Sequence, residues 1–215
     1  AMSTPLEAAG LNLNDTLWSA KALLECPDLV RKVHYDYYAA GANAVEACSY
    51  QATEAAFARK GIEKAEASRL IRLSGELVRE AKNDALLEHP EWDPADLLTA
   101  GSIGPYGAYL ADGSEYTGAY NLTREEYYAF HQLRLDELLN SGMDILAIET
   151  QPRFDEIEAL LAMIADRDIT CWVTVTLKDG DMPDGTKLEV LAKCLDADPH
   201  VEAFGFNCVK REWVE

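Results

Sequence analysis

The chain has 215 residues, of which 48% are hydrophobic and 27% charged, and its formal net charge is −19. This length is enough to bury a sizeable core, and the acidity disfavours nucleic acid and anionic membrane surfaces as partners while tolerating cationic or zwitterionic small ligands. No apolar run approaches the ~20 residues of a membrane span, no secretory signal is visible, and five irregularly spaced cysteines fit reduced thiols in a cytoplasmic protein.

The amino-terminal part of the chain predicts helices around one buried strand. Residues 6–14 are predicted to form a connector instead of a strand. Leu29, Val33 and Tyr37 recur at helical spacing, and Gly41 ends that helix. The elements expected here are a helix over about 28–40, a strand over 44–50, a short helix over 53–60 and a longer helix over 64–86.

A second buried strand is expected over 97–103, and a polar stretch rich in glycine and tyrosine follows it. Loops of this length are usually functional or disordered, so we predict that residues 106–120 form a lid after the strand. Tyrosine faces in this stretch can attract a cation, although packing is the commoner role of such residues.

The carboxyl-terminal half alternates strictly between strands and helices. Thr123 and Glu126 have the spacing of a capping box and predict a helix start. The elements expected are a helix to about 140, a strand over 144–150, a helix over 154–166, a strand over 171–177, a helix over 186–195 and a strand over 202–208.

Five apolar runs separated by helices predict an α/β fold with a parallel sheet. In such sheets the catalytic and ligand-binding residues lie at the carboxyl ends of the strands. An open doubly wound sheet would suit the length but lacks the G-x-G-x-x-G fingerprint, and a closed eight-stranded barrel needs about 250 residues. The sheet is therefore either open or an incomplete barrel. The strand-end residues are Tyr50, Ser102, Glu149, Thr150 and Cys208.

Several motifs, in order along the chain, resemble those of the homocysteine S-methyltransferases, especially the branch that uses S-methylmethionine. They lie at residues 17–20, 40–42, 49–53, 101–108, 112–118, 149–150 and 205–208. The resemblance implies a (β/α)8 TIM-like barrel, incomplete here, with about strands 2–6 present, the first strand trimmed and the last two missing. Residues 1–215 would then form a single partial domain.

The resemblance also implies zinc-dependent transfer of a methyl group from a sulfonium, S-methylmethionine or S-adenosylmethionine, to the thiol of homocysteine, giving methionine. The family holds its zinc with three cysteines, and one of them matches Cys208. The other two form a Gly-Gly-Cys-Cys motif that this sequence lacks, so we expect little or no activity from the chain by itself.

The same resemblance implies roles for the polar strand-end residues. An unpaired buried carboxylate is costly. Glu149 is therefore expected to bind the ammonium group of homocysteine, with Thr150 beside it, or else to form an internal salt bridge. Gln51 matches a substrate-contacting position, or is a solvated loop amide. Ser102 and Asn207 bind the substrate carboxylate, shape the pocket, or serve as turn residues.

Alternatives remain open at this point. Cys208 is either a metal ligand or an inert buried cysteine, and the other four cysteines are expected to pack in the core. A metal-independent barrel lyase or aldolase would require a lysine at a strand end, and none of the five strands has one. A non-catalytic fragment that self-associates through an open sheet edge is the third possibility.

Overall fold

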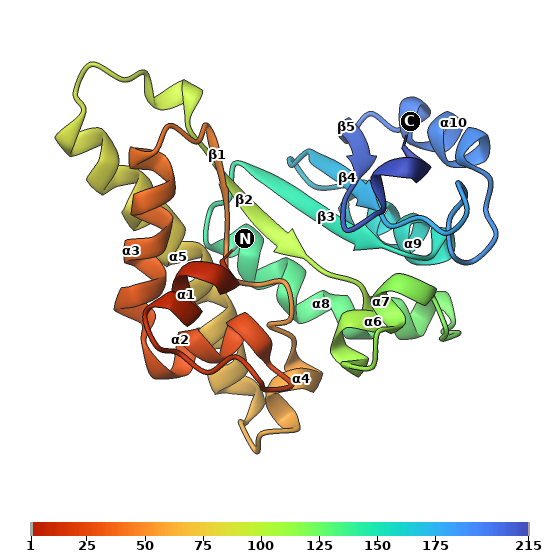
Figure 1. The fold of residues 1–215 in the computed structure, drawn as a ribbon, viewed down its shortest axis with the longest axis horizontal. Coiled ribbons are helices and arrows are strands. Elements are labelled where there is room, and N and C mark those ends of the chain that lie inside the picture. Colours follow the sequence, from red (N-terminus) through yellow and green to blue (C-terminus); the bar gives the residue numbers. More distant parts are fainter. Residues whose placement is uncertain (1, 215) are drawn as a thin grey trace. The chain divides into compact units, whose positions relative to one another are not determined.

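The computed structural model describes residues 2–214 and has an α/β architecture (Figure 1). The strands follow the order β1-β2-β3-β4-β5 in one sheet, and the pairings with a stated register are all parallel. The predicted α/β class with five parallel strands is therefore confirmed. The strands are β1 (Ala44–Glu46), β2 (Leu98–Ile103), β3 (Ile145–Gln151), β4 (Cys171–Val175) and β5 (Val201–Phe206).

The chain divides into two compact units. The first unit contains the chain up to Ser102 together with Leu133–Ile145, and the second contains Ile103–Gln132 and the chain from Leu146 onward. Each unit has its own buried residues.

The first unit packs helices beside β1 and β2. Its helices are α1 (Ser3–Ala8), α2 (Ala22–Glu25), α3 (Pro27–Ala39), α4 (Glu54–Ala58) and α5 (Lys64–Glu88), with short 3-10 turns at Trp18–Lys21 and Pro94–Asp96. The Tyr38 hydroxyl at the end of α3 donates to the Leu98 carbonyl over 2.8 Å. Hence α3 is tied to the start of β2.

Two predictions for this unit were wrong in detail. Residues 3–8 form a helix where a connector was expected from residue 6, because Leu6 is fully buried and Pro5 suits a first helical turn. The first strand ends at Glu46 instead of residue 50, since the chain turns at Ala47, whose carbonyl accepts from the Ser49 amide over 2.8 Å.

The second unit surrounds β3, β4 and β5. Its helices include α6 (Tyr106–Leu110), α7 (Ser114–Thr117), α9 (Phe154–Ile164) and α10 (Leu188–Ala197), with a 3-10 turn at Arg211–Trp213. Strand β4 lies between β3 and β5 and pairs with both in parallel. The long helix α8 (Arg124–Asn140) begins in this unit and continues into the first.

The predicted capping box at the start of α8 is confirmed. The Thr123 amide donates to the Glu126 carboxylate over 2.7 Å, and the Glu126 amide donates to the Thr123 hydroxyl over 3.2 Å. These two bonds satisfy donors that the first helical turn would otherwise leave without a partner.

The stretch expected to be an irregular lid loop contains two short helices, α6 and α7. Glycines in the left-handed region flank α7, Gly113 at φ 87° and Gly118 at φ 62°. A Cβ atom at Gly107 would lie 2.5 Å from the Glu115 amide nitrogen, so only glycine allows α6 and α7 to approach this closely. Glycine-rich composition here marks tight packing between helices.

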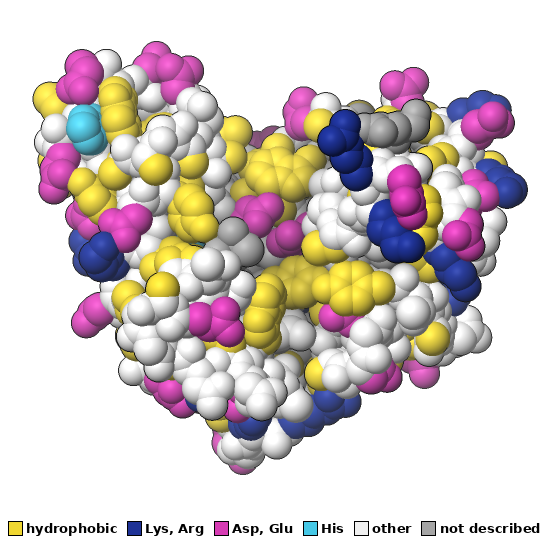
Figure 2. Space-filling model, in the orientation of Figure 1, with side chains coloured by type: hydrophobic (Ala, Val, Ile, Leu, Met, Phe, Trp, Pro, Cys, Tyr) yellow, Lys and Arg dark blue, Asp and Glu magenta, His cyan; other side chains and the backbone are white. Residues whose placement is uncertain are grey.

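Acidic side chains are spread over the face of the molecule drawn in Figure 2, in keeping with the net charge of −19. Within residues 2–214, no helix has the length and apolar character needed to cross a membrane.

We predict that Gly107→Ala lowers the free energy of unfolding by about 1–3 kcal/mol, because the new methyl group meets backbone atoms that cannot turn aside. Gly205→Ala is the matched control: a Cβ there meets nothing within 4 Å, and the effect should stay within about 0.5 kcal/mol. Urea denaturation followed by circular dichroism measures both. Equal effects of the two variants would contradict the close approach of α6 and α7.

Candidate functional site

The carboxyl end of β3 carries a backbone irregularity at Thr150. This residue has φ 56°, and the register of β3 against β4 shifts between Ile148 and Gln151. The Thr150 amide donates to the Thr174 hydroxyl of β4 over 3.3 Å, which supports the distorted strand end. A β-branched residue in the left-handed region is a strained outlier, typically by about 1–3 kcal/mol, and such strain clusters at functional sites.

The chain just beyond β5 turns in the same way. Cys208 has φ 53°, and the preceding Asn207 amide donates to the Val175 carbonyl over 3.2 Å. The Asn207 side-chain amide then donates to the Thr150 hydroxyl over 2.8 Å. This hydrogen bond connects the carboxyl ends of β3 and β5, the outer two strands of this unit. Three predicted site residues therefore come together: Thr150, Asn207 and Cys208.

Cys208 is exposed, but its electrostatic surroundings are strongly acidic. Partial burial raises the pKa of its thiol above the ordinary value, and the negative charges of Glu149 and Glu115 raise this pKa further. A hydrogen bond with the Thr150 side chain acts in the opposite direction by stabilising the thiolate. The Cys208 thiol is thus close enough to Glu149 for the charge of that carboxylate to act on it.

A buried carboxylate that sequence reasoning missed ties residues 106–120 to the start of α9. Glu156, in the first turn of α9, accepts hydrogen bonds from the Tyr106 amide over 2.6 Å and the Tyr120 hydroxyl over 2.6 Å. Its Oε1 lies 2.8 Å from His131 Nε2, and both side chains are completely buried. A signal existed in the sequence: Glu156 lies one helical turn before the buried Leu160, on the apolar face of α9.

The remaining predicted residues, Gln51 and Ser102, belong to the first unit. Both are buried, and the Ser49 hydroxyl donates to the Ser102 carbonyl over 2.7 Å. Buried Arg134 donates to the Tyr50 carbonyl over 2.6 Å, which orders the turn that carries Gln51. The structure therefore places Gln51 and Ser102 in ordered positions after β1 and at the end of β2.

The other cysteines differ in their surroundings. Cys48 and Cys171 are buried, and burial raises the pKa of each thiol to about 12, as expected for inert core residues. Cys26 and Cys194 are half-buried, so packing in the core describes them less well. Among residues 2–214, no three histidine, cysteine or acidic side chains are grouped so that they could hold a metal ion.

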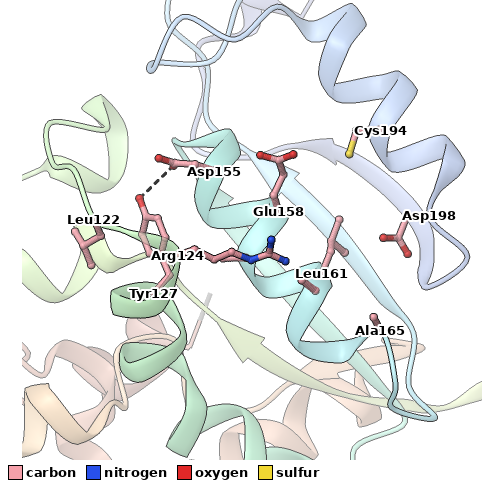
Figure 3. Close-up of a pocket in the computed structure, with 11 residues that line it drawn as sticks. Leu122, Arg124, Tyr127, Asp155, Glu158, Leu161, Ala165, Cys194 and Asp198 are labelled. Atoms are coloured by element: carbon pink, nitrogen blue, oxygen red, sulfur yellow. Dashed lines mark hydrogen bonds between the residues drawn. The ribbon is translucent and has the colours of Figure 1, made fainter.

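A pocket of about 410 Å³ lies among α8, α9 and α10 in the second unit (Figure 3). Glu158 and Leu161 project from α9, Cys194 comes from α10, and Asp198 follows directly after α10. None of the predicted site residues lines this pocket, and its surface lacks the strand-end geometry described above. We therefore assign the candidate site to the strand ends near Cys208, on the chemistry of its residues.

Comparison with known proteins identifies a single family over the whole chain. The family described as "Homocysteine S-methyltransferase" matches residues 1–215. The "Homocysteine S-methyltransferase" of Escherichia coli is 49% identical over 214 residues, which are 99% of this chain and 68% of that protein. "Homocysteine S-methyltransferase YbgG" of Bacillus subtilis is 44% identical, over 97% of this chain and 67% of that protein.

A solved structure agrees with the sequence relatives. The metallated form of the homocysteine methyltransferase MmuM from Escherichia coli matches with a TM-score of 0.93 at 49% identity. The match covers 99% of this chain and 74% of that one. The likeness is consistent with the expected incomplete barrel.

We predict opposite effects of Glu149→Gln and Thr150→Val on the reactivity of Cys208. Removing the carboxylate lowers the thiol pKa toward its ordinary value, so alkylation by iodoacetamide at pH 8 should become roughly threefold faster, the size expected for one partly screened charge. Removing the hydroxyl donor raises the pKa and should slow the reaction.

Peptide-level mass spectrometry measures each cysteine separately, and Cys194 serves as an internal control because the acids that act on it are Glu158 and Asp198. If Glu149→Gln left the Cys208 rate unchanged across pH 7–10, Glu149 would not face the thiol.

Proposed function

Since the chain belongs to the homocysteine S-methyltransferase family, we propose that it provides most of a site that transfers a methyl group from a sulfonium donor to the thiol of homocysteine. The donor is S-methylmethionine or S-adenosylmethionine, and the product is methionine. The observation that carries this proposal is the thiol of Cys208 beside Glu149 and Thr150 at one end of the second unit's strands.

The reaction requires the acceptor sulfur as a thiolate, because a neutral thiol is a poor nucleophile. An ordinary thiol has a pKa of about 8.5, so only a few per cent is ionised near neutrality. The acidic side chains near Cys208 disfavour any further negative charge there. A metal ion is the natural source of compensating positive charge, and the MmuM relative has been crystallised in a metallated form.

We propose zinc as this metal and Cys208 as one of its ligands. When bound by thiolates, zinc lowers the pKa of a coordinated thiol. Residues 2–214 contain no group of three suitable ligands, so these residues alone do not form a complete zinc site. The remaining ligands would have to come from outside them, and we expect the chain to bind zinc poorly and to have little activity by itself.

The side chains at the carboxyl ends of β3 and β5 suit the polar groups of an amino-acid substrate. Glu149 is half-buried and supplies negative charge for the ammonium group of homocysteine. The Asn207 side-chain oxygen is buried and accepts no hydrogen bond from the described residues, so it can accept one from a ligand. Substrate contacts of Gln51 and Ser102 stay predictions.

The alternative functions are less well supported. None of the five strands ends in a lysine, which a Schiff-base lyase or aldolase would require there. Self-association has one observation in its favour, since Phe204 on the terminal strand β5 is 46% exposed. Size measurement in solution would distinguish a dimer from a monomer.

The test measures zinc content and the rate of homocysteine methylation for two proteins. One is the chain itself, and the other is a version extended past residue 215 to the length of its E. coli relative. The extended version should hold about one zinc per chain and form methionine from homocysteine and S-methylmethionine. The chain alone should hold well below that amount and show at least a hundredfold less activity, because a single thiolate does not retain zinc.

Cys208→Ser in the extended version should weaken zinc binding by at least about tenfold and abolish activity, whereas Cys194→Ser, in α10, should leave both nearly unchanged. Full activity of the Cys208→Ser variant would refute the proposed role of this thiol.

A further inference from the structure

His200, in the loop between α10 and β5, is a titratable group that the proposed function does not use. Both of its ring nitrogens face backbone carbonyl oxygens: Nδ1 lies 2.9 Å from the Ile169 oxygen, and Nε2 lies 3.1 Å from the Ala165 oxygen. A carbonyl oxygen only accepts hydrogen bonds, so each ring nitrogen needs a proton in order to bind its partner. A neutral imidazole carries one such proton and an imidazolium carries two. The geometry therefore fits the protonated ring.

The two carbonyl groups lie at the two ends of the connection between α9 and β4. Ala165 follows directly after the last residue of α9, Ile164. The last carbonyls of a helix have no partner within the helix, and the helix dipole places partial negative charge there. A histidine cation at this end binds a free oxygen and is attracted by the dipole. Because Ile169 belongs to the segment just before β4, one protonated ring binds both ends of the connection.

The main chain of His200 is held on both sides. Its amide donates to the Asp198 carboxylate over 2.9 Å, and its carbonyl accepts from the Cys171 amide over 2.7 Å. The second bond joins the starts of β4 and β5, which then pair in parallel. Ala165 and Asp198 both line the pocket drawn in Figure 3, so the end of α9 lies beside the loop after α10. Backbone contacts that do not depend on charge therefore place the ring against its two carbonyls.

The charged groups near the ring are mostly acidic. The Ile169 carbonyl raises the pKa of the His200 ring above its ordinary value, desolvation opposes this, and the Ala165 carbonyl adds to the rise. The negative charges of Asp198 and Asp166 raise this pKa further. The adjoining segments of α9, β4, α10 and β5 carry these other titratable groups: Arg167, Asp168, Cys171, Asp196 and Glu202. The acids in this set outnumber the one arginine, so the surroundings favour the charged ring.

We propose that His200 is a pH-sensitive clamp, whose protonated ring ties the carboxyl end of α9 and the segment before β4 to the start of β5. Loss of one proton leaves a ring nitrogen that can only accept, facing a carbonyl oxygen, so one of the two bonds must break. The turn after α9 then separates more easily from the loop before β5. The clamp acts on the strand that leads to Asn207, from the end opposite the candidate site. This role is independent of the proposed function.

The direction of the pH effect follows from the two protonation states. The folded chain holds the His200 proton more tightly than the unfolded chain does, so the stabilising effect is fully present below the ordinary histidine pKa. The effect is lost as the pH rises through the higher pKa of the folded chain. Desolvation lowers the pKa of buried His34 to about 3, and this residue contributes the opposite trend as the pH falls. Comparing variants at the same pH cancels that contribution.

The first test is nuclear magnetic resonance of the protein with isotopically labelled histidine, because ring nitrogen shifts distinguish a doubly protonated ring from either neutral tautomer. At the pH at which histidine in the denatured protein is half protonated, most of the His200 rings should carry both protons. His200→Gln removes these signals and so assigns them. A His200 ring that is mostly neutral at this pH would overturn the proposal.

The second test is amide hydrogen exchange, which reports local opening. At a pH below the His200 titration, His200→Gln should speed exchange of the Cys171 amide about fivefold, because the cation at the end of α9 is lost. Above this titration the two proteins should exchange within about twofold of each other. His89→Gln, at the end of α5 in the first unit, is the matched control and should leave Cys171 exchange unchanged at either pH.

An effect of His200→Gln that is equal at both pH values would show that the ring stabilises the loop by packing alone, and the clamp would be refuted. Both tests are made on the chain and on the version extended past residue 215, so that the outcome does not depend on the stability of either one. No methyl transfer is measured, so failure of the proposed enzymatic activity would leave the result intact.

Discussion

A single hydrogen bond connects the outer two strands of the second unit at their carboxyl ends. The Asn207 amide donates to the Thr150 hydroxyl over 2.8 Å, and the Thr150 amide is bound in turn to Thr174 on the strand between them. Thr150 makes this contact from the left-handed conformation, and Cys208 adopts the same conformation immediately after Asn207. The strain at both residues is tolerated because the strands and their hydrogen bonds determine where the chain must go. The position of the Cys208 thiol beside Glu149 depends on this arrangement.

The charges at the site have a consequence for its chemistry. Partial burial and acidic neighbours raise the pKa of the Cys208 thiol, and this opposes the thiolate form in which a cysteine binds a metal. A site that only needed a reactive cysteine would carry a nearby cation instead. The acidic surroundings are consistent with a site that binds positively charged groups, such as a metal ion, a substrate ammonium group and a sulfonium. The buried Glu156 has a structural part, since its hydrogen bonds to Tyr106 and Tyr120 fix residues 106–120 at both ends.

Much of the fold could be predicted from the pattern of apolar residues. The five strands, the helices between them and the capping box of α8 follow from periodicity and helix-start signals, because these are local properties of the chain. The helices of residues 106–120 were missed because glycine and tyrosine composition is typical of loops, and helices this short depend on tertiary contacts, here the close approach of Gly107 to Glu115 and the hydrogen bond from the Tyr106 amide to Glu156. Clustering of Thr150, Asn207 and Cys208 was predictable from the rule that chemistry lies at strand ends. The contribution of Glu156 was not, because it depends on contacts with residues distant in the sequence, Tyr106, Tyr120 and His131.

The most direct test of the central claim, that Cys208 is a ligand of the metal, is X-ray absorption at the zinc edge on the version extended past residue 215. This measurement counts sulfur atoms at about 2.3 Å from the metal. The account predicts that the sulfur count falls by one in Cys208→Ser at equal zinc loading, and that adding homocysteine to the unchanged protein raises it by one. An unchanged sulfur count in Cys208→Ser would contradict it.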